Sequence, residues 1–191
     1  MSGAFPTSPV LRDIKITSYT PTLVSQTQSL KRQARSRGGH RWVITGRFPP
    51  MRRATMAPVY AFLVNQDGQK ETFTFIPPVY GESQGTASGT VTTSGTTSVG
   101  ATSATITGLT GTLLAGDFIK FQNHDKVYML TADEAAGTIN FKPALMEEVA
   151  SGQQVVYDSV PFTVALASDS SSFDAVPGDI NTLSVTFVEV I

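Results

Sequence analysis

"GGHRWVITGRFPPMRRATMAPVYAFLVNQDGQKETFTFIPP", residues 38–78, contains two strand-like alternations with a helical pattern between them. In the first alternation Trp42 and Phe48 fall on one side of a strand, because successive side chains of a strand point to opposite faces. In the second, Phe73 and Phe75 share a face in the same way. The stretch therefore predicts two half-buried strands that contribute to one β-rich core.

The segment between these strands changes to a helical period. Its apolar stripe consists of Met56, Val59 and Leu63, with Phe62 beside it. Thr55 is the expected N-cap, and Gly68 is the expected left-handed residue after the helix. We therefore expect one short helix that covers the core. The expected core anchors of the whole stretch are Trp42, Phe48, Phe62, Phe73 and Phe75.

Strand patterns also lie on both sides of this stretch. Residues 13–19, "DIKITSY", alternate as a half-buried strand does. Residues 181–191, "NTLSVTFVEVI", are apolar enough to predict a buried strand, paired inside a sheet that the N-terminal strands begin. Residues 22–36, "TLVSQTQSLKRQARS", have little apolar content, so they predict a long exposed strand or arm.

The composition shifts after residue 82. Residues 83–103 are rich in Gly, Ser and Thr, as in a linker, and short strand patterns follow at close spacing up to residue 157. Such spacing is typical of a small β-barrel or sandwich. The sequence thus predicts a mainly β protein. Its β-sandwich or split-barrel host domain, residues 1–82 plus 158–191, has one short α-helix, and a small β-barrel, residues 83–157, is inserted into it.

The composition excludes several kinds of chemistry. The chain has 191 residues, 40% of them hydrophobic, and no cysteine, so disulfides and cysteine-based metal or thiol sites are excluded. No apolar run reaches about 18 residues, so we expect no membrane span, and the N-terminus lacks the apolar core of a secretion signal. His40 and His124 stand at no metal-binding spacing and are expected in turns or at the surface. Nucleophile-elbow and phosphate-loop motifs are absent, so we expect no enzyme activity, metal or cofactor.

Charge is divided unevenly along the chain. Residues 1–53 hold ten Lys and Arg against one acid, a formal +9, and residues 54–191 hold four Lys against fourteen acids, a formal −10. The basic residues expected to make contacts are Lys31, Arg32, Arg35, Arg37, Arg41 and Arg47. Three roles are open for them: binding to acidic protein surfaces, binding to nucleic-acid phosphates, and keeping the protein soluble. Arginine predominates and no nucleic-acid-binding motif accompanies it, which favours contacts between subunits.

The predicted barrel contains side chains that two other functions would use. Aromatic rings such as those of Tyr128 and Phe141 are possible glycan contacts, although most aromatic residues of a small barrel pack in its core. A glycosidase would place two carboxylates across a cleft. The acids near the predicted turns are Asp133, Glu134, Glu147 and Glu148, and nothing in the sequence brings them together.

The order of these segments resembles the tail proteins of tailed bacteriophages, in particular distal tail or baseplate-hub adaptor proteins. The resemblance covers nearly the whole chain and rests most on "WVITGRFP" before the helix and "GQKETFTF" after it. The central "AGDFIKF", "KVYML" and "PAL" are similar to the inserts of such proteins. The chain departs from the pattern in size, because many distal tail proteins have a larger C-terminal domain. A tail-tube end protein or another baseplate ring component therefore stays an alternative.

The resemblance implies a noncatalytic structural protein of the virion tail, assembled in the host cytoplasm. Copies would form a closed homo-oligomeric ring, a hexamer, and contact neighbouring tail-tube, hub or fibre proteins. No specific nucleic acid is an expected partner. Two alternatives stay open: a carbohydrate-binding or host-recognition module of the virion, and a nucleic-acid-binding protein.

Overall fold

The computed structural model describes residues 2–191, except for the side chain of Val176. It is mainly β, with one α-helix among the described residues, which confirms the predicted fold class. The chain divides into two compact units. Unit 1 contains the residues up to Val10, Thr72–Val164 and Val190–Ile191, and unit 2 contains Leu11–Glu71 and Ala165–Glu189. The predicted insertion boundary at residues 83–157 stays a prediction.

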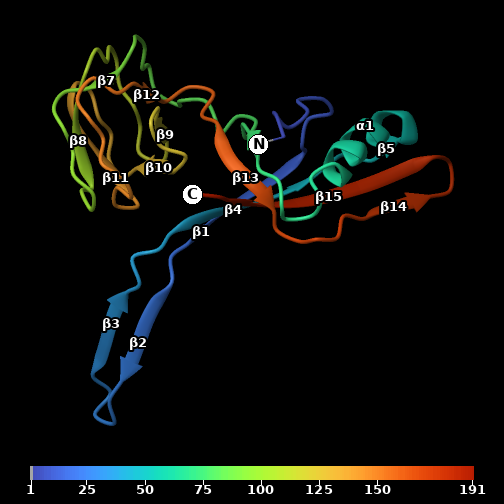
Figure 1. Cartoon of the computed structure of the whole chain (residues 1–191), viewed down its shortest axis with the longest axis horizontal. Coiled ribbons are helices and arrows are strands. Elements are labelled where there is room, and N and C mark those ends of the chain that lie inside the picture. Colours follow the sequence, from blue (N-terminus) through green and yellow to red (C-terminus); the bar gives the residue numbers. More distant parts are fainter. Residues whose placement is uncertain (1) are drawn as a thin grey trace. The chain divides into compact units, whose positions relative to one another are not determined.

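Unit 2 is built on antiparallel strands (Figure 1). Its elements are β1 (Asp13–Tyr19), β2 (Thr22–Gln26), β3 (Arg32–Ser36), β4 (Arg41–Arg47), β5 (Met51–Arg52), α1 (Arg53–Val64), β14 (Phe173–Val176) and β15 (Ile180–Glu189). β4 lies between β1 and β15, with Ile44 opposite both Ile16 and Phe187. Gly46 shares the buried face of β4, where a Cβ would lie 2.9 Å from the side chain of Leu11. A larger residue there would have to displace that leucine.

The helix α1 buries a narrow apolar stripe. Its buried residues are Met56, Val59 and Leu63, which are the residues of the predicted stripe. The N-cap position belongs to Arg52, so the prediction of Thr55 as N-cap is wrong, and no side chain caps this end. The N-cap could not be recognised from the sequence, because Arg52 has none of the side-chain acceptors that usually mark a cap. Gly68 takes a left-handed conformation, φ 69°, in the turn after the helix.

Unit 1 combines a short strand pair with a larger sheet. Its strands are β6 (Phe73–Phe75), β7 (Thr92–Thr93), β8 (Ser103–Thr107), β9 (Phe118–Phe121), β10 (Val127–Leu130), β11 (Gly137–Lys142), β12 (Val155–Val156) and the first part of β13 (Phe162–Leu166). β6 pairs antiparallel with β13, and Phe75 lies opposite Phe162. The N–H of Phe5 donates to the carbonyl of Thr74 at 2.8 Å. The N-terminal segment therefore covers the other side of β6.

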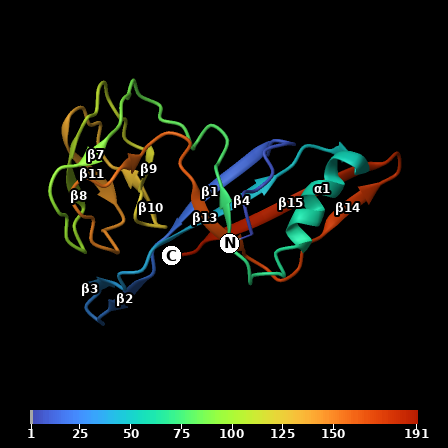
Figure 2. The ribbon, with the colours of Figure 1, turned by 45° about the horizontal axis from the view of Figure 1, so that its top comes forward.

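The larger sheet of unit 1 is nearly a closed barrel. Its strand order is β12-β9-β10-β11-β8-β7, and all these pairings are antiparallel. The two end strands meet, because the N–H of Val155 donates to the carbonyl of Val91 at 2.9 Å and Thr92 forms a bridge with Gln154. Figure 2 shows these strands wrapped around a common interior. Closure satisfies the backbone groups that an open edge would expose.

One side of the barrel is fixed to β13 by a ring contact and by polar contacts. The rings of Phe118 and Phe162 meet edge to face, with centroids 5.3 Å apart. The hydroxyl of Thr163 donates to the carboxylate of Asp125 at 3.0 Å, and the ammonium of Lys120 lies 3.4 Å from the same oxygen. Within unit 1 these contacts join the barrel to the strand that follows it in sequence.

Candidate functional site

The strands of the β2–β3 hairpin in unit 2 are fully exposed; we call residues 20–37 the arm. Every residue of both strands is exposed. The turn is closed by the N–H of Thr27, which donates to the carbonyl of Lys31 at 3.1 Å, and Leu30 takes φ 63° there. Figures 1 and 2 show the hairpin extending beyond the ends of β1 and β4. The sequence predicted an exposed strand or arm but not its turn, because "TQSL" lacks the Gly, Pro, Asn and Asp that usually mark one.

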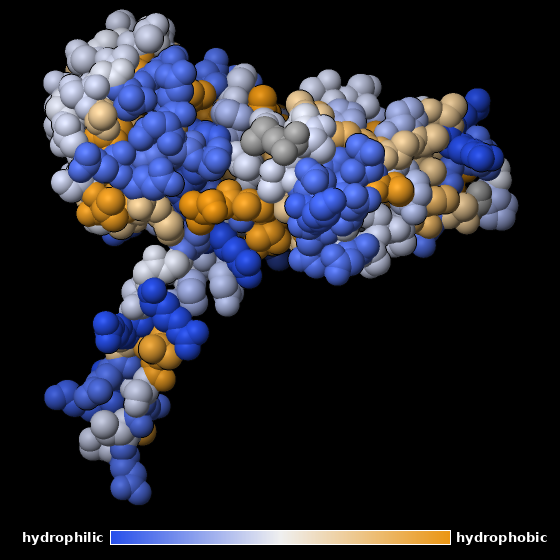
Figure 3. All heavy atoms as spheres, viewed as in Figure 1, coloured by the Kyte–Doolittle hydropathy of each residue, from blue (hydrophilic) through white to orange (hydrophobic). Residues whose placement is uncertain are grey.

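The arm is basic along its second half and carries no acid. Between Asp13 and Asp67 the sequence contains no acidic residue at all. The exposed basic residues in and beside β3 are Lys31, Arg32, Arg35 and Arg37. Leu23 lies opposite Arg35 in the pairing, so an apolar and a basic side chain share one face. Figure 3 shows hydrophobic and strongly hydrophilic side chains intermixed along the arm.

A change of register separates the arm from the sheet. Tyr19 pairs with Arg41 in the sheet, and Thr22 pairs with Ser36 in the arm. Residues 20–21 of one strand therefore face residues 37–40 of the other. This is a β-bulge with two extra residues on the second strand. Gly38 allows this with φ 80°, and a bulge bends the ribbon and changes its twist. The arm thus runs in a different direction from the β1–β4 pair that it continues.

The base of the arm is held by buried aromatic residues. His40 is buried, with its Nε2 atom 3.0 Å from the hydroxyl of Ser18 and its ring edge-on to Trp42 at 4.7 Å. The backbone N–H of Trp42 donates to the buried carboxylate of Glu189 at 3.0 Å. The expectation that His40 lies at the surface is wrong, because its imidazole fills the space beside the indole. The guanidinium of Arg41 lies 5.4 Å from the centroid of the Tyr19 ring.

The structure does not place all six predicted contact residues together. Lys31, Arg32, Arg35 and Arg37 lie on the arm, and Arg41 stands at its base. Arg47 is exposed at the other end of β4, about 20 Å away along a strand that rises ~3.3 Å per residue. It lines a shallow hollow with Asp13, Lys15, Thr45 and Ser184. Arg47 therefore belongs to a separate surface.

Tyr128 and Phe141 present no ring face to a sugar, so their prediction as glycan contacts is wrong. Both side chains are fully buried in the barrel. Their rings meet edge to face at 5.3 Å, and each also packs against Phe121, at 5.6 and 5.7 Å. A barrel this small needs its large rings as core, since they contribute the most buried area.

His124 is likewise buried in the barrel rather than exposed in a turn. Its Nδ1 atom lies 3.1 Å from the hydroxyl of Tyr128, which accepts the N–H of Met146 at 3.3 Å. Burial lowers the pKa of His124 and the charge of Lys120 acts the same way, whereas the backbone of Glu148 and the carboxylate of Glu147 oppose them. The neutral imidazole is therefore part of the barrel's hydrogen-bonded interior.

The predicted core anchors of the opening stretch lie in both units. Trp42 and Phe48 are buried in unit 2, and Phe73 and Phe75 are buried in unit 1. In unit 1, Phe5 stacks on Phe73 with centroids 5.9 Å apart and meets Phe75 edge to face at 5.5 Å. Phe62 is only half-buried, because it lies beside the stripe that α1 turns inward.

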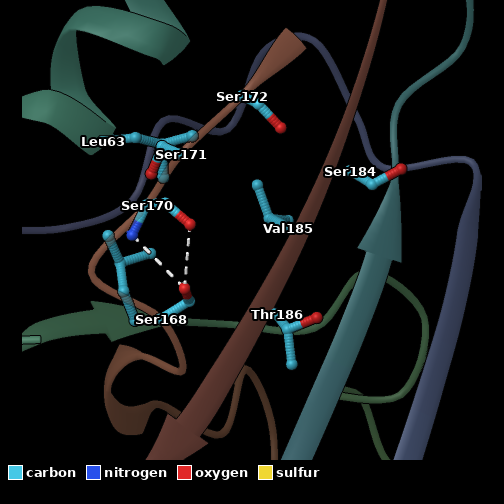
Figure 4. A pocket seen from close by; sticks show the side chains of 9 residues that line it. Leu63, Ser168, Ser170, Ser171, Ser172, Ser184, Val185 and Thr186 are labelled. Carbon is cyan, nitrogen blue, oxygen red and sulfur yellow. Dashed lines mark hydrogen bonds between the residues drawn. The ribbon is translucent and has the colours of Figure 1, made fainter. Parts of the chain in front are cut away.

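A small hollow of about 140 Å³ in unit 2 is lined mainly by hydroxyl groups (Figure 4). Its polar lining comes from Ser168, Ser170, Ser171, Ser172, Ser184 and Thr186, and its apolar lining from Leu63, Leu166 and Val185. The loop that carries the serines is fixed by Asp169, whose carboxylate accepts the side-chain amide of Gln69 at 3.1 Å. No charged or aromatic side chain lines the hollow, so it offers neither an acid–base pair nor a stacking surface.

The sequence was compared with protein-family models and with curated proteins. No protein-family model matches the sequence, and no curated protein matches it. Within residues 2–191, no three His, Cys, Asp or Glu side chains gather as a metal site, and the helix is neither long nor apolar enough to cross a membrane. The arm, with every residue of its two strands exposed, is the candidate functional site.

Proposed function

We propose that this protein is a noncatalytic structural component of a bacteriophage tail, a distal tail or baseplate protein. Copies form a hexameric ring at the distal end of the tail tube or in the baseplate and link the tube to the receptor-binding apparatus. The protein is assembled in the host cytoplasm and works in the virion. The observation that carries the proposal is the arm, a basic hairpin that is exposed on every strand residue.

The arm is suited to binding because it has no core of its own. A two-stranded hairpin is marginally stable in water, since its few backbone hydrogen bonds hardly offset the entropy lost on ordering. A partner that covers the arm supplies the missing burial. Leu23 and Val24 are each about half exposed, at 51% and 54%, so apolar area is present for such a partner to cover.

The charge distribution supports another copy of the same protein as the partner. Subunits in a ring with head-to-tail contacts need two different, complementary surfaces. The +9 of residues 1–53 and the −10 of residues 54–191 supply opposite charges on one chain. Arginine guanidinium groups pair with carboxylates in a two-pronged geometry, and Arg35 and Arg37 are exposed for it. The basic arm of one copy therefore binds an acidic surface of the next.

The alternatives draw less support from the described residues. Glycan binding loses its two predicted aromatic contacts, because Tyr128 and Phe141 are buried. Nucleic-acid binding would use the same arginines on phosphates, but the arm exposes no aromatic side chain for base stacking. We keep DNA binding as an outcome of the test below.

The test compares the purified wild type with a variant in which Arg32, Arg35 and Arg37 are changed to Glu. Mass photometry and negative-stain class averages should show closed rings for the wild type and monomers for the variant. A control variant reverses Arg52 and Arg53, which are exposed on unit 2 outside the arm, and should still form rings. A wild type that stays monomeric at high protein concentration contradicts the proposal. Rings in the triple variant, together with loss of salt-sensitive DNA retention, would favour nucleic-acid binding.

A further inference from the structure

Unit 1 exposes a cluster of apolar side chains between β6 and the barrel. Ile76 is 45% exposed, Val79 is 80% exposed and Tyr80 is 54% exposed. We call residues 76–80 the apolar tip. Three large apolar residues are thus exposed within five positions of the chain, and exposed apolar area of this kind is suited to contact with a partner.

The backbone of the apolar tip is strained in a way that turns Val79 outward. Val79 has φ 67°, a left-handed conformation that β-branched residues rarely adopt. The N–H of Tyr80 donates to the carbonyl of Pro78 at 2.8 Å, so Val79 is the centre of a γ-turn of the rare positive-φ type. The N–H of Gly81 donates to the carbonyl of Pro77 at 2.8 Å and closes the turn. Strain of this kind is characteristic of binding positions.

Two carboxylates stand next to the apolar tip. The hydroxyl of Ser159 donates to Glu82 at 3.1 Å, and the N–H of Val160 donates to the carbonyl of Gly81 at 2.9 Å, so the two segments run side by side. Asp158 lies in the second segment, and a side-chain hydrogen bond with it raises the pKa of Glu82. Two carboxyl groups therefore meet beside the apolar tip, and a neighbouring cation would favour the charged form of both.

The arm has the complementary composition. Leu23 and Arg35 share one face of the hairpin because they lie opposite each other. The face is thus apolar and basic, whereas the tip and its neighbours are apolar and acidic. Surfaces with matched apolar area and opposite charge select one another as partners.

We propose that the apolar tip of one copy docks on the arm of a second copy, with Glu82 and Asp158 facing Arg35 and Arg37. The inference rests on the proposed ring and names the contact that builds it. Because tip and arm are different surfaces, each copy offers one of each to its two neighbours, which generates a closed ring when the rotation closes.

A charge-exchange experiment tests the pairing. Reversing the acids (Glu82→Lys with Asp158→Lys) and reversing the arm (Arg35→Glu with Arg37→Glu) should each weaken self-association at least about tenfold in Kd. A 1:1 mixture of the two variants should restore it, because reversed tips then meet reversed arms around an alternating ring. The matched control Glu147→Lys with Glu148→Lys reverses exposed acids elsewhere in unit 1 and should leave association unchanged.

The substitution Val79→Gly separates binding from folding. Glycine takes the left-handed conformation without steric cost, so the variant should unfold at a higher temperature than the wild type. It should nevertheless associate about tenfold more weakly, because it lacks the outward apolar side chain. If the variant is more stable and associates normally, the apolar tip is not part of the contact between copies.

Cross-linking identifies the partner copy. The chain has no cysteine, so Val79→Cys and Leu23→Cys variants are each singly reactive. Under oxidation, a mixture of the two should give a disulfide-linked dimer that joins residue 79 to residue 23. If reversing the arm abolishes the rings but reversing Glu82 and Asp158 leaves them intact, the apolar tip is not the partner of the arm, and the proposed function stands. If the wild type forms no oligomer, both fail.

Discussion

The barrel of unit 1 and the arm of unit 2 are both made of short antiparallel strands, yet they are stabilised in opposite ways. The barrel closes β7 onto β12 and fills its interior with fully buried side chains such as Phe121, Tyr128 and Ile139. The arm pairs two strands of five residues each and buries none of their side chains. Backbone pairing alone therefore makes the shape of a hairpin, whereas stability requires a second layer or a partner.

The largest expected difference between the two regions is in core truncation. Phe121→Ala should lower the free energy of unfolding by about 3–5 kcal/mol, because the ring is fully buried among three aromatic neighbours. Leu23→Ala in the arm should change it by less than about 0.5 kcal/mol. Urea denaturation measures both. Equal losses would mean that the arm packs in the folded monomer.

A pair of glycines compares a tight and an open turn of the barrel. Gly108 has φ 85°, and a Cβ there would clash with the backbone carbonyl oxygen of Thr90. Gly95 has φ 92° and open space around it. Gly95→Ala should cost only the conformational strain, about 1–2 kcal/mol, and Gly108→Ala about 2–5 kcal/mol because backbone must also move. Thermal unfolding of both variants measures the two losses of stability. Similar losses would show that the backbone around Gly108 moves easily to accept a Cβ.

The barrel should also be sensitive to acid through His124. Burial lowers its folded-state pKa below the ordinary value of 6.5, so the unfolded chain binds the proton first as the pH falls. Stability is then full above about pH 6.5 and decreases below it until the folded pKa is reached. His124→Gln should reduce this slope in unfolding experiments between pH 7.5 and 5. An unchanged slope would assign the acid sensitivity to other groups.

The smallest effect is expected from arm charges on folding. Changing Arg32, Arg35 and Arg37 to Glu should shift the free energy of unfolding by roughly 0–1 kcal/mol per residue, because exposed charges are screened by water. Differential scanning calorimetry of dilute monomer provides the measurement. A large loss of stability would place these guanidinium groups in contacts within the subunit.

The sequence predicted what depends on local pattern. The alternation around Trp42, the stripe of Met56, Val59 and Leu63 and the exposure of the arm all follow from side-chain periodicity. Contacts between residues far apart in the chain could not be predicted from the sequence. Phe5 donates a backbone hydrogen bond to Thr74, about seventy positions away, and packs on Phe73, and no local pattern indicates this.

The candidate site was predicted in composition but not in geometry. The basic residues were found from charge, whereas the bulge at Gly38 and the separation of Arg47 depend on strand register. The apolar tip was missed because "IPPVYG" reads as a strand end, and only the φ of Val79 shows the outward turn. The burial of His40 and His124 was missed because their partners, Ser18 and Tyr128, were not expected to approach them.

Amide hydrogen exchange of residues 22–36, in the monomer and in the assembled state, tests the central claim most directly. Isolated hairpins open readily, so the monomer should show little protection in the arm while the barrel strands exchange slowly. Assembly should protect the arm strongly and leave the barrel core unchanged. Strong protection of the arm in the monomer, or weak protection in both states, would contradict the account that a neighbouring copy stabilises the arm.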